Sequence, residues 1–552
     1  MTGGTPDLLQ PPLPLQLVWL GLLAVATLDW LRRGWRDGQR KERRLALGLL
    51  VALAAVGLAR WLTDVPQFLH ANLHGPALLG DILGFPRLAE ERAEYGCGHP
   101  TLVGLLAALF GRRWEVVAHI DQAFGIATLG LVAWQAQRWL ARPSLAYWVL
   151  AVAALAPALT RIAASEDAHT SAALMACLAT LALDRYGRRR QGADLVLAVL
   201  AAGWMLWTRQ TLILWLPVAV ALPLLQHRDL RRDPKIVLTV IALLALLGLR
   251  VVASWQHPGD HFTYMVLLEL AKQPAVLLPL LSHHPLFSPE FSLFTAPLLL
   301  FGWVLLPQAA PLGRPLAGAL LALLVATLLF GVPALGSNLG FRISLLLLAL
   351  VPQALAAQWL ADRLGKVQPA LAVALAAAPM AMPSWQPLHE LAPLDREYTL
   401  LRTLLPQLPK GAALAVPALH EPAPAWTIPR HLLPPGSHLI DMDDRAPRNV
   451  PVYWVLGVAC RARSPLELLG GSDARLRAQV AADSYRMVAP QAPATLRSDC
   501  AKWLATSRPV GPVLRLAARD ELPFALYGGA PVTLALMIRP AAAAVDPTEL
   551  AR

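Results

Sequence analysis

About a dozen long apolar runs, separated by short connections, constrain the fold of this chain more than any other feature of its sequence. Only 15% of its 552 residues are charged and 56% are hydrophobic, whereas soluble proteins are about 25% charged. A helix that spans a bilayer needs about 20 apolar residues. Runs of roughly this length lie at 13–31, 45–61, 119–140, 143–160, 169–184, 193–208, 211–226, 235–254, 292–310, 315–333, 341–360 and 367–383. The sequence therefore predicts an all-α polytopic membrane protein with about twelve transmembrane helices.

The connections between these runs predict the orientation of the chain in the membrane. The first, RRGWRDGQRKERR (32–44), has seven basic and two acidic residues, and basic connections stay on the cytoplasmic side. Alternation then places these basic segments inside: 184–190, 227–235, Arg314 and 362–366. It places these segments outside: both termini, 62–100, 161–168, 255–291 and everything after 384. These clusters account for the net charge of +12, so we expect no nucleic-acid partner. The start MTGGTPDLLQPP has no basic n-region, so 13–31 is expected to be a retained anchor.

A long polar interruption, residues 62–100, is acidic and contains histidine. It has five acidic residues against two arginines, together with His70, His74 and His99. Most other connections are short and basic, so we expect this loop to present a site at the outer membrane surface. Residues 97–118 then contain an apolar part of about ten residues closed by Gly-Arg-Arg, which suits an amphipathic helix lying in the outer interface.

The composition changes after Pro383. Leu400, Leu401, Leu404 and Leu405 predict one face of an amphipathic helix, followed by a Pro-Lys-Gly turn and a short buried strand. Further strands are expected within 450–460 and 531–538, which predicts a small extracytoplasmic α/β domain large enough for its own core. The expected divisions are 1–44 (an extra N-terminal helix and basic loop), 45–383 (the transmembrane domain, with the outer loop 62–118), 384–540 (the α/β domain) and 541–552 (a disordered tail).

Four cysteines are present. Cys460 and Cys500 both fall in the domain expected outside, where a disulfide can persist. Sequence alone does not set the geometry of a bridge, so a disulfide and two free thiols both stay open. Cys177 is interpreted as a small packing residue within a span, and Cys97 has no evident partner. No CxxC or HExxH spacing appears, so nothing in the sequence supports a divalent metal, and the cofactor is unknown.

Two outer segments carry the candidate catalytic carboxylates. Asp64 follows the second span by two or three residues, and an ionisable group held at the membrane surface is a functional candidate. The alternative is that Asp64 caps a helix that begins near Pro66. Glu166 and Asp167 lie in the short segment RIAASEDAHT (161–170). They too can serve as helix caps, because acids favour a helix N-terminus.

Several outer residues are candidates for binding substrate. Four basic residues can meet a phosphate: Arg161, Arg209, Lys272 and Arg342. For each of them the alternative role is an interfacial anchor. His99 and His169 lie beside the acidic segments, and His99 is expected at the rim of a pocket.

The order of these motifs resembles the polyprenol-linked GT-C glycosyltransferases, a group that includes the protein O-mannosyltransferases and aminoarabinose transferases. The similar motifs are D-x-P-x-F-L-x-A (64–71), GHPTL (98–102), LFG (109–111) with Glu115 downstream, and R-x-x-x-S-E-D (161–167). The resemblance covers roughly residues 45–230. This chain departs from the group where Val65 follows Asp64 in place of a second acid, where Thr101 replaces a proline, and in having one extra helix at the start.

The resemblance implies a GT-C-like membrane enzyme, an inverting glycosyltransferase of the bacterial inner membrane. Its expected partners are a polyprenyl-phosphate-linked sugar, a cell-envelope acceptor and membrane lipids. No GxxxxGK loop and no GxGxxG after a strand is apparent, which agrees with a donor that arrives through the membrane. Asp64 is then the first choice for the general base. Two rivals stay open: a transporter, expected to show inverted repeats and broken helices, and a non-catalytic scaffold that displays the C-terminal domain.

Overall fold

The computed structural model describes the helical regions and the core of the C-terminal sheet. Described are residues 11–62, 96–111, 114–154, 168–255, 295–309, 311–331, 343–363, 370–374, 401, 403–416, 433–442, 452–456, 460, 498–511, 513–516 and 532–539. The chain divides into two compact units. The first comprises Met1–His70, Arg92–Leu267 and Leu277–His389, and the second Ala71–Glu91, Leu268–Val276 and Glu390–Arg552. The predicted domain boundaries remain predictions.

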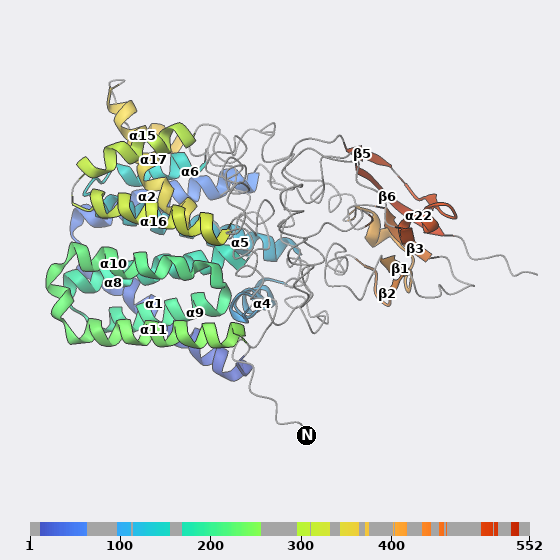
Figure 1. Ribbon diagram of the computed structural model, residues 1–552, viewed down its shortest axis with the longest axis horizontal. Helices are drawn as coiled ribbons and strands as arrows, with labels where there is room; N and C mark the ends of the chain where they lie inside the picture. Colours follow the sequence, from blue (N-terminus) through green and yellow to red (C-terminus); the bar gives the residue numbers. More distant parts are fainter. Residues whose placement is uncertain are drawn as a thin grey trace, which may run out of the picture. The chain divides into compact units, whose positions relative to one another are not determined.

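The described part of the first unit is helical, and its helices run side by side (Figure 1). The helices are α1 (Leu13–Asp37), α2 (Arg40–Leu62), α4 (Gly98–Phe110), α5 (Trp114–Trp139), α6 (Leu145–Ala154), α8 (Ala168–Arg189), α9 (Gly192–Thr208), α10 (Trp215–Gln226), α11 (Pro234–Trp255), α15 (Thr295–Leu305), α16 (Gly313–Gly331) and α17 (Ile343–Arg363). Short 3-10 turns are η2 (Gln210–Leu214), η3 (Arg228–Arg232) and η6 (Leu306–Gln308). Eleven of the predicted spans coincide with these elements, and residues 370–374 of the last one are also helical.

Three of the described helices are long and apolar enough to cross a membrane: Leu13–Asp37, Pro234–Val252 and Ile343–Arg363. Several shorter apolar helices accompany them, among them Gly192–Thr208 and Gly313–Ala326. The described part of the unit is therefore mostly helical and apolar, as the sequence predicts, and the number of about twelve spans stays a prediction.

Small residues allow the central helices to pack closely. In lipid the hydrophobic effect does not drive helices together, so close backbone approach and dispersion must do so. Helix α8 packs along α9 and also against α5 and α10. Alanines with almost no exposed surface lie along α5, α8 and α9: Ala133, Ala136, Ala172, Ala173, Ala176, Ala198, Ala201 and Ala202. This Ala-rich contact forms the closely packed centre of the described part of the unit.

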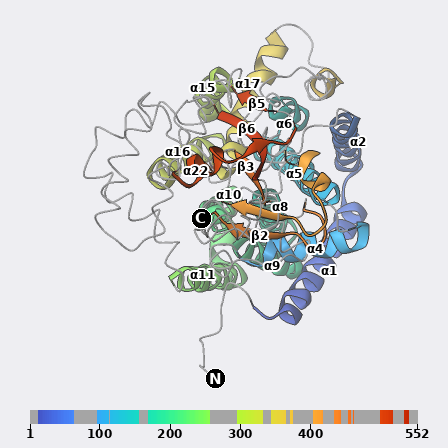
Figure 2. The same ribbon diagram turned by 90° about the vertical axis from the view of Figure 1, so that its right-hand side faces the viewer.

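The first two helices diverge from the two-residue connection Gly38–Gln39. Helix α1 packs on α9, where the Trp19 indole N–H donates to the Leu200 carbonyl at 3.0 Å. Helix α2 packs on α5 and α6, and shares few contacts with α1. At the other end of α1, Thr101 of α4 donates a hydrogen bond to Gln16. Figure 2, which looks along the helices, shows α4 beside α9 and α1, in agreement with their contacts.

Helix α5 begins at Trp114, five residues before the predicted start of the span at 119. The predicted span leaves out this polar first turn because its hydropathy is low, whereas in the structure the turn is helical. The preceding helix ends at Gly111, which has φ +113° and donates its N–H to the Ala107 carbonyl at 2.8 Å. This left-handed conformation favours glycine, so the predicted segment 97–118 is divided between α4 and α5.

The described part of the second unit contains a mixed β-sheet, with strand order β2-β1-β3-β6-β4 and β5 paired to β6. The strands are β1 (Ala413–Val416), β2 (His438–Asp441), β3 (Val452–Leu456), β4 (Arg508–Pro509), β5 (Leu514–Leu516) and β6 (Val532–Arg539). Strand β1 runs parallel to β2 and β3, and β6 runs antiparallel to β3. The sequence predicts β1, β3 and β6 and misses the short or polar strands β2, β4 and β5.

Both faces of this sheet are covered by apolar side chains. One cluster contains Leu401, Leu404 and Leu405 from the predicted amphipathic helix, packed against Leu414 and Val455. The other contains Trp454 and Trp503, and the second of these comes from α22 (Ser498–Leu504). The described C-terminal residues thus have their own apolar core and α/β character.

Cys460 and Cys500 form a disulfide with a Cα–Cα distance of 5.7 Å and a sequence separation of 40 residues. Both side chains are fully buried in the cluster around Trp503. Closing a loop of about 40 residues contributes roughly 3 to 4 kcal/mol by restricting the unfolded chain. We therefore expect Cys500→Ser to lower the unfolding midpoint of the C-terminal domain in denaturant titrations. Finding both thiols alkylated in denatured, unreduced wild-type protein would contradict the bridge.

Candidate active site

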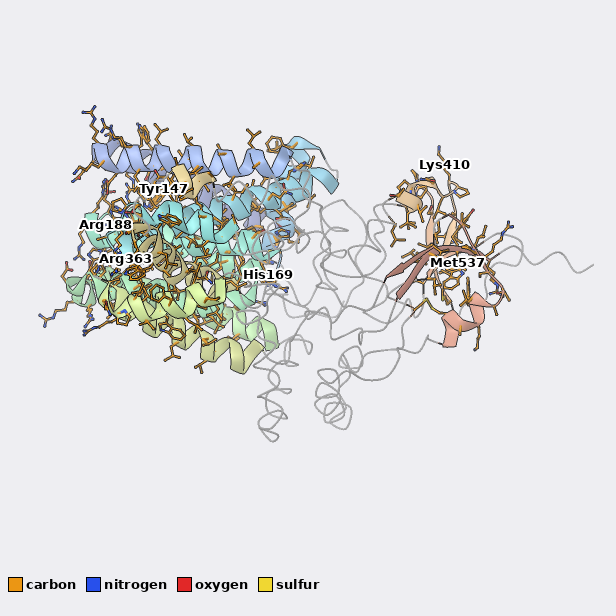
Figure 3. All side chains as sticks on the ribbon, turned by 90° about the horizontal axis from the view of Figure 1, so that it is seen from above. Tyr147, His169, Arg188, Arg363, Lys410 and Met537 are labelled. Atoms are coloured by element: carbon orange, nitrogen blue, oxygen red, sulfur yellow. A yellow bond between two sulfur atoms is a disulfide. The ribbon has the colours of Figure 1, made fainter. Side chains whose placement is uncertain are left out.

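Polar side chains are buried together at one end of the helical unit, around the first turn of α8. His99, Asp121, His169 and Ser171 all have no exposed surface, and Arg209 is 3% exposed. Figure 3 shows His169 at this end of the unit and Arg188 at the opposite end. Buried ionisable groups are costly among apolar helices and are functional candidates. We call these five residues the polar cluster.

Arg209 and His169 form the most informative pair of the polar cluster. The Arg209 Nε–H donates to the Nε2 atom of His169 at 3.1 Å. A guanidinium only donates hydrogen bonds, so the Nε2 atom of His169 must accept. The imidazole is therefore neutral and carries its proton on Nδ1. This bond holds a permanent positive charge beside a neutral histidine.

The end of α9 positions Arg209. The helix ends at Thr208, whose hydroxyl donates to the Trp204 carbonyl at 2.8 Å. Arg209 then turns to extended geometry, with φ −156° and ψ 121°, while its backbone N–H still donates to the Met205 carbonyl at 2.9 Å. The backbone of Arg209 is thus fixed by α9 and its side chain by His169 of α8.

His99 lies in the first turn of α4, between α5 and α8. Its Nδ1 atom is 2.9 Å from the Ser171 hydroxyl, and its Nε2 atom is 3.8 Å from the Asp121 carboxylate. The longer distance is that of an ion pair if the ring is protonated and exceeds hydrogen-bond length. The expected position of His99 at the rim of a pocket is wrong, because its side chain is fully buried.

Glycines of the GCGHP sequence bring α4 against the end of α9. A Cβ atom at Gly96 would collide with the Trp207 carbonyl, and one at Gly98 would collide with the Thr208 hydroxyl. His99 follows directly in the chain, so the glycine at 98 sets the distance between His99 and the end of α9 that carries Arg209. The similarity of GHPTL to the motif of the GT-C group thus falls on residues that position the polar cluster.

Replacing Gly98 with alanine is expected to destabilise the protein by about 1 to 3 kcal/mol, the usual cost of overpacking. The displaced end of α4 should also lower activity by shifting His99. Gly104 lies in the same helix and has no atom within 4 Å of an added Cβ, so Gly104→Ala should be neutral or stabilise the helix by up to about 1 kcal/mol. Thermal unfolding of the two variants in detergent checks this, and equal melting temperatures would contradict it.

Asp121 is a member of the polar cluster that the sequence analysis did not single out. It lies on α5, and Thr170 of α8 donates a hydrogen bond to its Oδ1 atom at 3.3 Å. Thr170 is in turn fixed to α5, because its carbonyl accepts from the Thr128 hydroxyl at 3.4 Å. The sequence did contain a signal for Asp121, because a single acidic residue at the start of a predicted span is a functional candidate. Asp121 was missed because the spans were judged to be nearly free of acids.

The opposite end of the unit carries a network of arginines and carboxylates. Arg138 contacts Glu42 at 2.8 Å and Asp184 at 3.9 Å, and Arg188 contacts Asp184 at 2.8 Å. Near it, the Tyr186 hydroxyl donates to Asp233 at 2.6 Å, and this bond holds the pKa of the Asp233 carboxyl below its ordinary value. Apart from Arg138, which lies near the end of the predicted span 119–140, these residues belong to the basic segments that the charge pattern predicts to be cytoplasmic.

The remaining predicted site residues lie outside the described part of the chain. They are the three candidate catalytic acids, Asp64, Glu166 and Asp167, and the basic residues Arg161, Lys272 and Arg342. Of the predicted substrate-binding residues, the structure describes His99, His169 and Arg209 and places all three in the polar cluster. Within the described residues, no three His, Cys, Asp or Glu side chains gather as a metal site.

No protein family model and no curated protein matches the chain. Among solved structures it is similar to the crystal structure of ArnT from Cupriavidus metallidurans bound to undecaprenyl phosphate, with 16% identity and a TM-score of 0.48 over 74% of this chain and 93% of that chain. The apo state of the same protein gives 15% identity and a TM-score of 0.46 over the same shares.

Proposed function

We propose that this chain is a membrane glycosyltransferase that moves a sugar from a polyprenyl-phosphate donor to a cell-envelope acceptor on the extracytoplasmic side. The observation that carries the proposal is the buried pair of Arg209 and His169 at the first turn of α8. A buried positive charge suits a reaction in which a phosphate leaves as an anion. The sequence resemblance points to the same part of the chain, because 98–102 contains His99 and 161–167 directly precedes α8 in the sequence.

The proposed reaction is a single displacement at the anomeric carbon. A carboxylate takes the proton of the acceptor hydroxyl or amine while the acceptor atom bonds to the anomeric carbon. The bond from that carbon to the phosphate oxygen breaks, and its electron pair leaves with the phosphate. General-base help of this kind contributes about 10²- to 10⁴-fold. The absence of a covalent sugar intermediate makes the reaction inverting.

Asp64 is the proposed base, with Glu166 and Asp167 as the acids that complete the site. Asp64 follows the last residue of α2 by two positions, and Asp167 directly precedes Ala168, the first residue of α8. Consecutive elements joined by short connections are usually neighbours. The proposed phosphate-binding groups are Arg209 and the outer basic residues Arg161, Lys272 and Arg342, with His99 and His169 fixing the site around them.

The membrane supplies the donor in this proposal. A catalytic site on the outer side sees no cytoplasmic nucleotide sugar, and the sequence shows no phosphate-cradling glycine loop. In a lipid-linked donor, the polyprenyl tail lies among apolar helices while the phosphate meets arginine. Phosphate recognition by arginine is strong because the guanidinium offers paired, charged N–H donors.

The test is a transfer assay with the purified full-length protein in proteoliposomes. A panel of polyprenyl-phosphate sugars is supplied with lipid, glycan and protein acceptors from a cell envelope, and release of the polyprenyl phosphate is measured. We expect release with one donor class that depends on the acceptor. Release with no donor, together with solute uptake into the same vesicles, would favour the transporter. Inactivity in both assays would favour the scaffold.

A further inference from the structure

A cavity of about 370 Å³ opens at the basic end of the helical unit, between α1, α2, α5 and α8. Its volume lies within the range of small-molecule sites, about 300–1,000 Å³. It exists because α1 and α2 leave their short connection in different directions and pack on different neighbours. It is far from the polar cluster, at the Arg188 end of α8 (Figure 3). The proposed transfer reaction makes no use of it.

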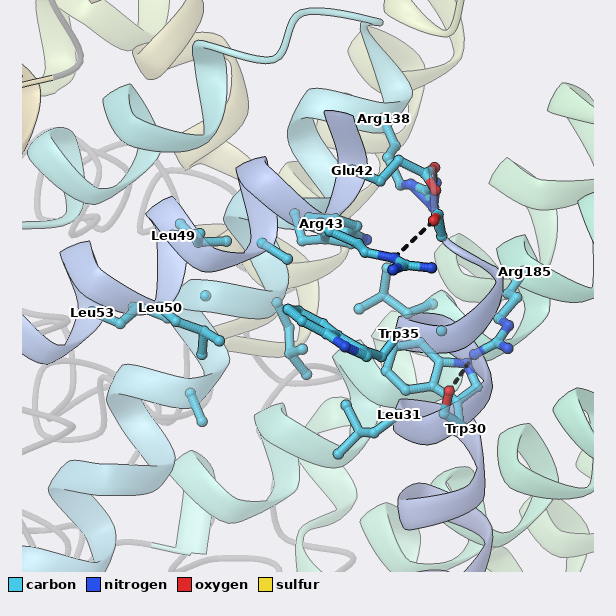
Figure 4. A pocket seen from close by; sticks show the side chains of 18 of the residues that line it. Trp30, Leu31, Trp35, Glu42, Arg43, Leu49, Leu50, Leu53, Arg138 and Arg185 are labelled. Atoms are coloured by element: carbon cyan, nitrogen blue, oxygen red, sulfur yellow. Dashed lines mark hydrogen bonds and ion pairs between the residues drawn. The ribbon is translucent and has the colours of Figure 1, made fainter. Parts of the chain in front are cut away.

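The charged part of the cavity wall is strongly basic. Five arginines and one acid, Glu42, line it. The arginines are Arg43, Arg138, Arg185, Arg188 and Arg189. Figure 4 shows Arg43, Arg138 and Arg185 on one side of the cavity, and Leu49, Leu50 and Leu53 on the other. A ligand with an anionic headgroup and an apolar tail would match these two sides, with the headgroup at the arginines and the tail at the leucines.

Carboxylates pair with four of these five arginines. Arg138 contacts Glu42 and Arg188 contacts Asp184, both at 2.8 Å, while Arg189 contacts Asp37 at 3.0 Å and Arg185 contacts Asp194 at 3.8 Å. Arg43 differs from them, because it donates to the backbone carbonyls of Gly38 and Arg36 and forms no ion pair with a described carboxylate. Arg43 is also exposed at the mouth of the cavity. Arg43 is therefore the arginine best suited to contact an anionic group that enters the cavity from the surrounding membrane.

Aromatic side chains indicate the depth of the cavity in the membrane. Trp30, Trp35 and Trp134 line it, and tryptophans gather where lipid headgroups meet the hydrocarbon. The Arg138 guanidinium lies 5.3 Å from the ring centroid of Trp134, and that of Arg185 lies 5.4 Å from the ring centroid of Trp30. These distances are those of cation–π contacts, which hold the two guanidinium groups beside the tryptophans.

Apolar side chains continue from the cavity along the outside of α1 and α2. Leu31 is 53% exposed, Trp35 54% and Leu50 58%. Such surfaces in a membrane protein lie against lipid chains. A soluble phosphate or an acidic peptide would leave these walls uncovered, whereas acyl chains cover them.

We infer that this cavity binds an anionic phospholipid, with the headgroup phosphate at Arg43 and the acyl chains between α1 and α2. By the positive-inside rule this lipid belongs to the cytoplasmic leaflet, where anionic headgroups attract basic residues near the membrane. The lipid fills the space between two helices that hardly touch each other, and so joins α1 to the centre of the unit. The inference concerns a structural lipid and holds whatever reaction the protein performs.

Native mass spectrometry of the delipidated full-length protein tests this inference. Phosphatidylglycerol, phosphatidylcholine and inorganic phosphate are added separately, and the bound lipid per protein is counted. We expect phosphatidylglycerol to be retained well above phosphatidylcholine, and millimolar phosphate not to displace it. Arg43→Gln should lower phosphatidylglycerol occupancy about five-fold, the loss expected for one basic residue near an anionic headgroup.

Arg44→Gln is the matched control, because Arg44 is the next residue of α2, is exposed and does not line the cavity. It should retain lipid as the wild type does. Ala46→Phe fills the cavity without a change of charge and should also lower occupancy. The inference is overturned by equal retention of the two lipids, by equal losses in Arg43→Gln and Arg44→Gln, or by displacement with inorganic phosphate. Stronger retention of a polyprenyl phosphate that Arg43→Gln abolishes would reassign the cavity to the donor and overturn it as well.

Discussion

Replacing Asp64 with asparagine is expected to reduce the turnover of sugar transfer by about 100-fold or more. Asparagine keeps the size of aspartate but cannot take a proton from the acceptor. The protein should still fold, because Asn caps a helix about as well as Asp and the change should cost well under about 1 kcal/mol if Asp64 also caps. Binding of a polyprenyl-phosphate analogue should persist, since the base acts on the acceptor. Single-turnover transfer in proteoliposomes measures the effect.

Asp81→Asn is the control for Asp64→Asn, because it removes a second carboxylate from the same acidic loop. We expect it to leave turnover within about two-fold of the wild type, because the proposed reaction gives this carboxylate no role. An Asn variant at 64 with full transfer activity would remove Asp64 from the mechanism. Glu166→Gln and Asp167→Asn would then be the variants that reveal the base.

Helix positions are largely readable from the sequence, since a lipid-facing helix must be apolar along its length. The predicted span at 193–208 and α9 (Gly192–Thr208) differ by one residue. The start of α5 was placed five residues late, because Glu115 and the Arg-Arg pair before it were assigned to the segment 97–118. Inside the bundle Asp121 has Thr170 as a partner, and partners from other helices are invisible to a hydropathy profile. Strand β2, HLID, was missed for a related reason, because only its pairing with β1 identifies it.

The polar cluster was only partly predictable. His99, His169 and Arg209 stand out as polar residues beside apolar runs on the predicted outer side, and they do lie at one end of the unit. Their burial was not predictable, because it results from the approach of α4 to α9 at Gly96 and Gly98. The hydrogen bond between His99 and Ser171 was not predictable either, because the two residues are 72 positions apart in the chain. Tertiary packing turns residues that look like interfacial anchors into a fixed internal site.

Arg209→Gln is expected to lower kcat about 10²- to 10³-fold, the usual cost of removing one donor that stabilises a developing anion. The variant also deprives the buried His169 of its donor, which should cost about 1 to 3 kcal/mol of stability. The melting temperature of the variant must therefore be measured, and it must lie above the temperature of the assay. Arg231→Gln is the control, because Arg231 is an exposed arginine whose hydrogen bond goes to the Leu224 carbonyl. It should leave both kcat and stability near the wild-type values.

Two roles for Arg209 make different kinetic predictions. If the guanidinium stabilises the leaving phosphate, Arg209→Gln lowers kcat and kcat/KM together, as when an interaction made only in the transition state is lost. Arg209→Lys should then keep part of the activity, since the charge remains although the fork geometry is lost. If Arg209 only orients His169, then Arg209→Gln, His169→Ala and the double variant should share one loss, because the two residues then act as a unit. The proposed phosphate role requires the double variant to be slower than His169→Ala alone, and equal rates for these two variants would rule it out.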